Sequence, residues 1–135
     1  IPEIIHGFAN MHATIRVTPK DRAWDDPSQA SRPFSRDRKG FVLSEGAGVM
    51  VLAAEDAVRM YGLTPRAEVL GVGWSSDAHH FTSPNPPTII QAMRDAIDDA
   101  ELKPEDIQYV NAHGTSTPKG DFNEIFCIKE VFGRH

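Results

Sequence analysis

The segment Asn111–Pro118, which reads Asn-Ala-His-Gly-Thr-Ser-Thr-Pro, holds the residues best suited to chemistry in this sequence. His113 can move a proton or stabilise charge, and Thr115 and Thr117 can exchange hydrogen bonds with an amide-bearing ligand. Gly114 allows the sharp turn that such a loop needs. The spacing alone fits a functional histidine and a satisfied structural histidine equally, so both interpretations stay open at this point.

The reactive side chains after this loop are better explained by structure than by catalysis. Asp121 falls near the start of the next expected helix, where the helix dipole favours a carboxylate, so capping is its structural interpretation. Cys127 lies between Phe126 and Ile128, with no basic neighbour or helix N-terminus to activate its thiol. We therefore interpret Cys127 as a small buried hydrophobe and not as a nucleophile.

Two adjacent histidines, His79 and His80, lie in the polar loop Ser75–Pro84 and invite a metal-site interpretation. Neighbouring side chains on an extended loop point apart, and no cysteine or acidic residue stands at ligand spacing. We expect a polar loop over a cleft and no metal. A metal-dependent hydrolase built on His79, His80 and His113 remains an alternative, which would bind zinc.

The composition limits the classes of protein that these residues can serve. The 135 residues allow one ordinary domain, and shares of 40% hydrophobic and 24% charged residues are typical of a globular chain. A net charge of −5 argues against a nucleic-acid-binding surface. No apolar run approaches the roughly 20 residues that span a bilayer, no signal peptide is recognised, and one cysteine excludes a disulfide scaffold. We expect a soluble intracellular protein with no nucleic-acid or membrane partner.

Hydrophobic periodicity and turn residues predict alternating helices and strands, which is typical of α/β layer structures. Thr88 is the expected N-cap of one helix, and residues 17–34 and 74–87 are expected loops. The polar loop 113–120 would then follow a strand, where α/β sheets bind ligands. The expected helices are residues 4–13, 53–61, 88–99 and 121–132, and the expected strands are residues 40–52, 67–73 and 107–112.

Several segments occur in an order and at a spacing typical of one enzyme family. They are Arg32–Phe34, Asp37–Arg38, Gly40–Val42, Glu45–Gly48, Ser75–Ala78 with His80, and Asn111–Pro118 with Gly120–Asp121 and Glu124. Together they resemble the β-ketoacyl-acyl-carrier-protein synthases, most closely the type II elongating enzymes of fatty-acid synthesis. The ketosynthase domains of polyketide synthases share much of this pattern.

The resemblance implies a partial thiolase-like fold of αβαβα layers. Residues 1–64 would end the N-terminal ketosynthase half, and residues 65–135 would begin the C-terminal half. Because a parallel sheet needs cover on both faces, such a partial fold is expected to expose apolar edges.

The reaction implied by the resemblance is the decarboxylative Claisen condensation of an acyl thioester with malonyl-acyl-carrier protein. His113 matches the first of two catalytic histidines and would stabilise the enolate that forms as carbon dioxide leaves. Thr115 and Thr117 match residues that bind the amides of the phosphopantetheine arm. His80 and Thr82 match the loop at the mouth of that channel.

Asp121 and Glu124 match acidic residues near the site, and we expect a structural, ion-pairing role for Glu124. The implied partners are an acyl carrier protein and, for the whole enzyme, a second copy in a homodimer. No cofactor is expected beyond the phosphopantetheine arm of the carrier. The cytoplasm is the expected compartment, with an organelle stroma or matrix as the alternative.

The family's nucleophilic cysteine lies upstream of the matching segments, and its second catalytic histidine and active-site lysine lie downstream. Covalent catalysis needs the nucleophile and its activating groups together, so this chain alone is expected not to catalyse condensation. Two alternatives remain open. One is a polyketide ketosynthase domain, and the other is a truncated, non-catalytic paralogue that binds a carrier protein or a partner subunit.

Overall fold

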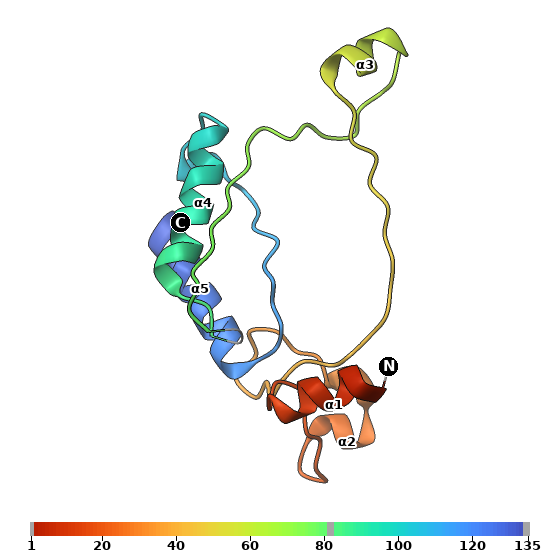
Figure 1. The fold of residues 1–135 in the computed structure, drawn as a ribbon. Coiled ribbons are helices and arrows are strands. Elements are labelled where there is room, and N and C mark those ends of the chain that lie inside the picture. The colour runs from red at the N-terminus through yellow and green to blue at the C-terminus, as the bar shows by residue number, and fades with distance from the viewer. Residues whose placement is uncertain (1, 81–82, 134–135) are drawn as a thin grey trace.

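The computed structural model describes residues 2–80 and 83–133, which form helices joined by long extended segments. In Figure 1, α4 and α5 lie side by side, α1 and α2 are at the bottom of the view, and α3 stands apart at the top, so the chain forms an open ring. The helices of these residues are α1 (Pro2–Asn10), α2 (Arg22–Asp25), α3 (Glu55–Met60), α4 (Pro86–Asp99) and α5 (Pro118–Phe132), with the 3-10 turns η1 (Pro27–Gln29) and η2 (Pro104–Asp106).

All four expected helices are present, but three of them, α1, α4 and α5, begin two or three residues earlier than the sequence predicts. Thr88 is not the N-cap of α4, because this helix begins at Pro86 after Asn85; the Thr88 hydroxyl donates to the Asn85 carbonyl at 2.8 Å. The next helix, α5, likewise begins at Pro118 after Thr117. Proline suits the first turn because its φ is already helical and its missing N–H is not needed there. None of the helices in the described part of the chain is long and apolar enough to cross a membrane.

The expected loop 17–34 contains two short elements, α2 and η1, and is ordered by local hydrogen bonds. The backbone N–H and the hydroxyl of Thr18 donate to the Asp21 carboxylate at 2.8 and 2.7 Å. Lys39 pairs with the same carboxylate, and the bonds from Lys39 and Thr18 lower the pKa of Asp21 to about 2. The loop is therefore tied to the segment that follows it.

The three segments expected to be strands are extended but unpaired, so their prediction as strands is wrong for this structure. Among the described residues, β pairing is limited to one parallel bridge between Thr14 and Phe41. Phe41 also stacks edge-to-face on Phe8, with ring centroids 5.1 Å apart. A strand satisfies its backbone N–H and C=O groups through a neighbour, and local sequence signals do not supply that neighbour.

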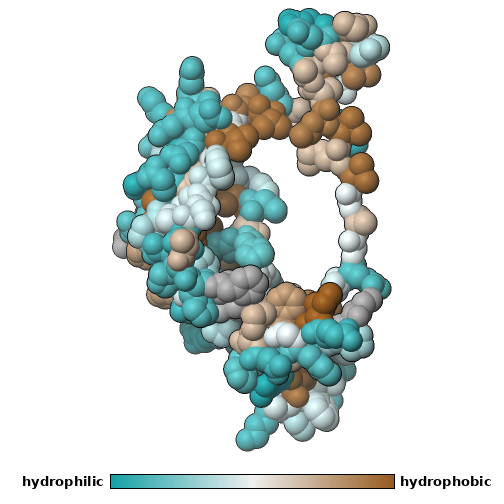
Figure 2. Space-filling view, in the orientation of Figure 1, coloured by the Kyte–Doolittle hydropathy of each residue, from teal (hydrophilic) through white to brown (hydrophobic). Residues whose placement is uncertain are grey.

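Apolar side chains of the extended segments face solvent, which confirms the expected exposed apolar edges. The exposed fraction is 95% for Val49, 87% for Val51 and 85% for Trp74. Figure 2 shows hydrophobic residues gathered along the thin upper part of the ring. Among the described residues, the buried hydrophobic side chains are Ala23, Ile97 and Cys127, and of these three Cys127 alone is fully buried.

One extended segment packs closely on α4 through two glycines. A Cβ on Gly71 would lie 2.5 Å from the Ala100 nitrogen, and a Cβ on Gly73 would lie 2.0 Å from the Ala92 carbonyl oxygen. The Val72 N–H between them donates to the Asp99 carboxylate at 2.9 Å. The absence of side chains at these two positions therefore sets the distance between this segment and the helix.

We expect Gly73→Ala to destabilise the protein by about 1–3 kcal/mol, because overpacking against a helix backbone forces both elements to shift. The added Cβ would meet the Ala92 carbonyl oxygen and the Ala96 nitrogen, neither of which can move cheaply. Gly46→Ala is the matched control, since nothing lies within 4 Å of its Cβ position. Thermal unfolding of both variants in the whole native protein measures the effect, and equal Tm values would contradict this packing.

Candidate active site

Residues 111–117 lead into α5, and Thr117 is the N-cap of that helix. Its Oγ1 accepts a hydrogen bond from the Gly120 N–H at 3.1 Å and lies 3.0 Å from Oγ1 of Thr115. A Cβ on Gly120 would lie 2.4 Å from Thr117 Oγ1, so the turn needs glycine there. The structure therefore brings together the two hydroxyls that the sequence predicts as ligand-binding groups.

Glu124, in α5, holds the backbone on which His113 sits. Its Oε1 accepts the His113 N–H at 2.5 Å and its Oε2 accepts the Gly114 N–H at 2.8 Å. Gly114 has a φ of +53°, in the left-handed region that favours glycine. Among the described residues no cation lies within salt-bridge distance of Glu124, so its expected ion pair stays a prediction. Consecutive amides turned toward one carboxylate satisfy its charge instead.

The side chain of His113 is exposed, in contrast to its fixed backbone. Within residues 2–80 and 83–133, the imidazole makes no hydrogen bond. The imidazole therefore belongs to an exposed residue on a loop whose position Glu124 determines. This arrangement favours a group that acts on a bound ligand over a histidine that is satisfied within the protein.

Ser116, between the two threonines, is fully buried in a strained conformation. Its φ is +65°, which costs a non-glycine residue about 1–2 kcal/mol. Its Oγ accepts the Arg32 N–H at 3.1 Å, and its carbonyl accepts the Gly40 N–H at 3.0 Å. The segment Arg32–Gly40 therefore holds the middle of the threonine loop from outside.

Asp121, one turn into α5, is bound to the same segment. It is 1% exposed, and its Oδ2 accepts the Phe34 N–H at 2.6 Å and lies 3.2 Å from Nε of Arg38. The capping interpretation of Asp121 is wrong, because Thr117 caps the helix and the Asp121 carboxylate points to another segment. Its role is to attach residues 32–40 to the start of α5.

Arg32, Phe34 and Arg38 are the site residues that sequence reasoning missed. They lie in segments that carry the family resemblance, but no role was assigned to them. The Phe34 ring lies 3.4 Å from the position of a Gly114 Cβ, so it packs beneath the histidine loop. A buried carboxylate needs a positive partner or amide donors, but the burial of Asp121 is seen only in the folded structure.

The predicted channel loop is organised by Asp77. Its carboxylate accepts the His79 N–H at 3.0 Å and the Asn85 N–H at 2.7 Å, and these bonds lower the pKa of Asp77. His80 occupies an exposed position of this loop. Thr82 lies outside the described residues. The binding roles of His80 and Thr82 stay predictions.

The described residues contain no cluster of three or more His, Cys, Asp or Glu side chains arranged to hold a metal ion. Nδ1 of His79 lies 3.2 Å from the Ser83 carbonyl oxygen of its own loop. His79 is thus engaged within its own loop.

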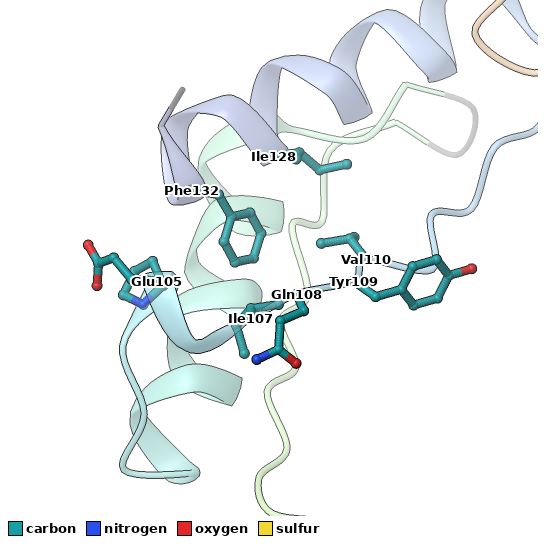
Figure 3. Close-up of a pocket in the computed structure, with 8 residues that line it drawn as sticks. Glu105, Ile107, Gln108, Tyr109, Val110, Ile128 and Phe132 are labelled. Carbon is teal, nitrogen blue, oxygen red and sulfur yellow. The ribbon is translucent and has the colours of Figure 1, made fainter. Parts of the chain in front are cut away.

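Two open hollows lie near the ends of α5, and neither is lined by His113. One, of about 320 Å³, lies where Ile128 and Phe132 of α5 face Ile107 and Val110 of the extended segment before the site (Figure 3). The other, of about 340 Å³, is lined by six residues: His12, Thr14, Arg16, Arg38, Lys39 and Pro118. His113 is an exposed residue and does not line either of these hollows.

Comparison with known proteins identifies the family that carries this loop. Residues 66–135, just over half of the chain, match the model of the β-ketoacyl synthase C-terminal domain. The chain belongs to the β-ketoacyl synthase family. This segment of a β-ketoacyl synthase contains the histidine loop, both threonines, Asp121 and Glu124.

Curated relatives extend the match toward the N-terminus. The chain is 47% identical over 111 residues to 3-oxoacyl-[acyl-carrier-protein] synthase 2 of Staphylococcus aureus and 49% identical over 111 residues to that of Vibrio cholerae. Each match covers 81% of this chain. The chain spans only 28% and 27% of the length of these two relatives.

Solved structures confirm the partial thiolase-like fold that the resemblance implies. A β-ketoacyl synthase from Burkholderia phymatum superposes with a TM-score of 0.87 at 37% identity, covering 98% of this chain and 31% of that one. A ketosynthase in complex with a type II polyketide acyl-carrier protein superposes with a TM-score of 0.84 at 31% identity, with coverage of 98% and 32%. The helices and unpaired extended segments are therefore arranged as in intact ketosynthases.

Cys127 of this β-ketoacyl synthase chain is a structural residue, as its sequence context predicts. It is fully buried, with its Sγ 3.6 Å from the Pro86 carbonyl oxygen at the start of α4. Burial raises the pKa of the thiol, which disfavours the thiolate that a nucleophile requires. The contact between Cys127 and Pro86 instead forms part of the packing of α5 on α4.

Proposed function

We propose that the protein containing this chain is a 3-oxoacyl-acyl-carrier-protein synthase, which extends an acyl chain by decarboxylative Claisen condensation. The acyl group is carried as a thioester on a nucleophilic cysteine of the whole enzyme. Malonyl-acyl-carrier protein loses carbon dioxide, and the electrons of the broken C–C bond form an enolate. The enolate carbon attacks the acyl thioester carbonyl, and the cysteine thiolate leaves.

The observation that supports this proposal is the His113 loop. Glu124 fixes the backbone of His113 through two N–H bonds, while the exposed imidazole has no partner among the described residues. A positioned N–H donor at the thioester oxygen stabilises the charge that develops as carbon dioxide leaves, without reorganisation during the reaction. In this role His113 contacts the reacting atoms and is a catalytic residue.

The neighbouring hydroxyls fit the carrier arm of such a substrate. Thr115 and Thr117, whose Oγ1 atoms lie 3.0 Å apart, would bind the phosphopantetheine amides, with His80 and Thr82 at the entrance of the channel. The remaining partners in this proposal are an acyl carrier protein and a second copy of the enzyme in a homodimer. The compartment we propose is the cytoplasm.

The test is to supply the whole native protein with two substrates: acyl carrier protein loaded with an acyl group, and acyl carrier protein loaded with a malonyl group. Mass spectrometry follows the 3-oxoacyl product, and carbon dioxide release is measured in parallel. We expect one carbon dioxide for each 3-oxoacyl-carrier protein formed. Absence of both acyl transfer and carbon dioxide release would contradict the proposal and favour a non-catalytic paralogue that binds a carrier or a partner subunit.

A polyketide ketosynthase is the second candidate function, and two solved structures favour it. The ishigamide ketosynthase/chain length factor superposes with a TM-score of 0.82 at 36% identity, and the second is the ketosynthase–carrier complex described above. The two functions differ in the fate of the product of one condensation. In the assay above, without reducing enzymes, a fatty-acid enzyme stops after one round, whereas a polyketide ketosynthase adds further malonyl units to the unreduced product.

A further inference from the structure

We propose that Arg38 is a positioning residue, which orients the Thr115–Thr117 loop for the carrier arm of the substrate. This inference rests on the proposed function, because it assigns the support of the hydroxyls that would bind that arm. Arg38 lies 79 residues before Thr117 in the sequence, on the segment Arg32–Gly40.

All three nitrogens of the Arg38 guanidinium donate hydrogen bonds, and two of them join that segment to the start of α5. Its Nε–H donates to the Thr117 carbonyl at 3.1 Å, and its Nη2 donates to the Pro118 carbonyl at 2.7 Å. Nη1 donates to the Ser35 carbonyl at 2.9 Å, which fixes the group to its own loop. The side chain is only 18% exposed. One planar group thus specifies the position of two consecutive carbonyls.

Arg38 lies at the N-terminus of α5, where a positive charge is stable only beside a negative one. A cation at a helix N-terminus is disfavoured by the helix dipole, so Arg38 needs a compensating charge at the start of α5. The buried carboxylate of Asp121 supplies it, with Oδ2 3.2 Å from the Arg38 Nε. Arg38 and Asp121 therefore depend on each other, and together they join residues 32–40 to the helix.

Arg38 influences the positions of the Thr115 and Thr117 hydroxyls through the backbone of Thr117. Arg38 holds the Thr117 carbonyl, while Oγ1 of the same residue accepts the Gly120 N–H and contacts Thr115 Oγ1. Between them, Ser116 keeps a positive φ only while the Arg32 and Gly40 N–H groups hold it. A shift of the Thr117 carbonyl would therefore rotate both threonine hydroxyls away from their places.

The test compares two substrates of the whole native protein: malonyl-pantetheine, which has the amides of the arm, and the malonyl thioester of ethanethiol, which has none. Arg38→Lys keeps the charge but replaces the planar fork by a point charge that cannot serve both carbonyls. We expect the KM for malonyl-pantetheine to rise about tenfold, with kcat changed less than about twofold. The KM for the ethanethiol ester is expected to stay unchanged.

Arg59→Lys is the matched control, because the Arg59 side chain is 66% exposed on α3. Equal losses on both thioesters, or no loss on either, would overturn the positioning role of Arg38. Inactivity of the wild-type protein on both thioesters would overturn the proposed function and this inference with it.

If Arg38→Lys does not fold, as judged by circular dichroism, Asp121→Asn takes its place. Asparagine keeps an acceptor for the Phe34 N–H but removes the charge, so the same selective loss is expected and an equal loss overturns the role.

Discussion

Replacement of His113 by alanine is expected to slow malonyl decarboxylation by the whole native protein about 10²–10³-fold. The imidazole is the exposed group of a loop that Glu124 holds through two N–H bonds of 2.5 and 2.8 Å. Removal of one preorganised donor leaves the enolate charge unstabilised, while the loop backbone keeps its support. The measurement is the rate of carbon dioxide release from malonyl-carrier protein at saturating substrate.

The pattern across partial reactions makes this prediction specific. Transfer of an acyl group to the enzyme involves no enolate, so this first step is expected to continue in His113→Ala. The matched control is His6→Ala, since His6 is exposed on α1 and is not part of the histidine loop. A His113→Ala protein that releases carbon dioxide at the wild-type rate would contradict a catalytic role for this histidine.

Substitution of Glu124 by glutamine is expected to lower kcat/KM about ten- to hundredfold, although the two side chains have nearly the same shape. The carboxylate accepts the His113 and Gly114 N–H groups with separate oxygens. Glutamine has one acceptor oxygen, and its NH₂ group would face the second N–H. An unsatisfied donor of this kind costs about 1–3 kcal/mol, so the loop would leave the conformation that presents His113.

Glu130→Gln is the control for this variant, because Glu130 lies on the same helix with its side chain exposed. Steady-state kinetics of both variants, with thermal unfolding measured alongside, separate a local effect from a loss of fold. If Glu124→Gln and Glu130→Gln have the same kcat/KM, the two N–H bonds of Glu124 do not position the histidine.

The sequence predicted the helices of this chain far better than its strands. Residues 88–99 and 121–132 show apolar residues at helical spacing, and a helix satisfies its own backbone, so local signals suffice. The N-termini of these two helices lie two or three residues before their expected positions, because the helices begin at Pro86 and Pro118. Segments such as 107–112 have apolar character suited to strands, but a strand exists only where a second segment lies beside it.

In the candidate site, too, residues close together in the sequence could be predicted, whereas residues far apart in the sequence could not. His113, Thr115 and Thr117 lie within five residues, so composition and the family resemblance were enough to propose them. The role of Arg38 could not be predicted, because its partners, Thr117 and Asp121, are about 80 residues further along the chain. An ion pair of this kind is fixed by how the chain is folded, and no local pattern indicates which charges will meet.

The distance in sequence between Arg38 and Thr117 also bears on the order of events during folding. Their hydrogen bond closes a loop of 79 residues, and the conformational entropy of that closure must be overcome before the bond contributes any stability. Contacts of such long range form slowly, whereas α4 and α5 need only local ones. In refolding, helical circular dichroism should therefore recover before enzymatic activity, and the interval between them would time the assembly of the threonine loop.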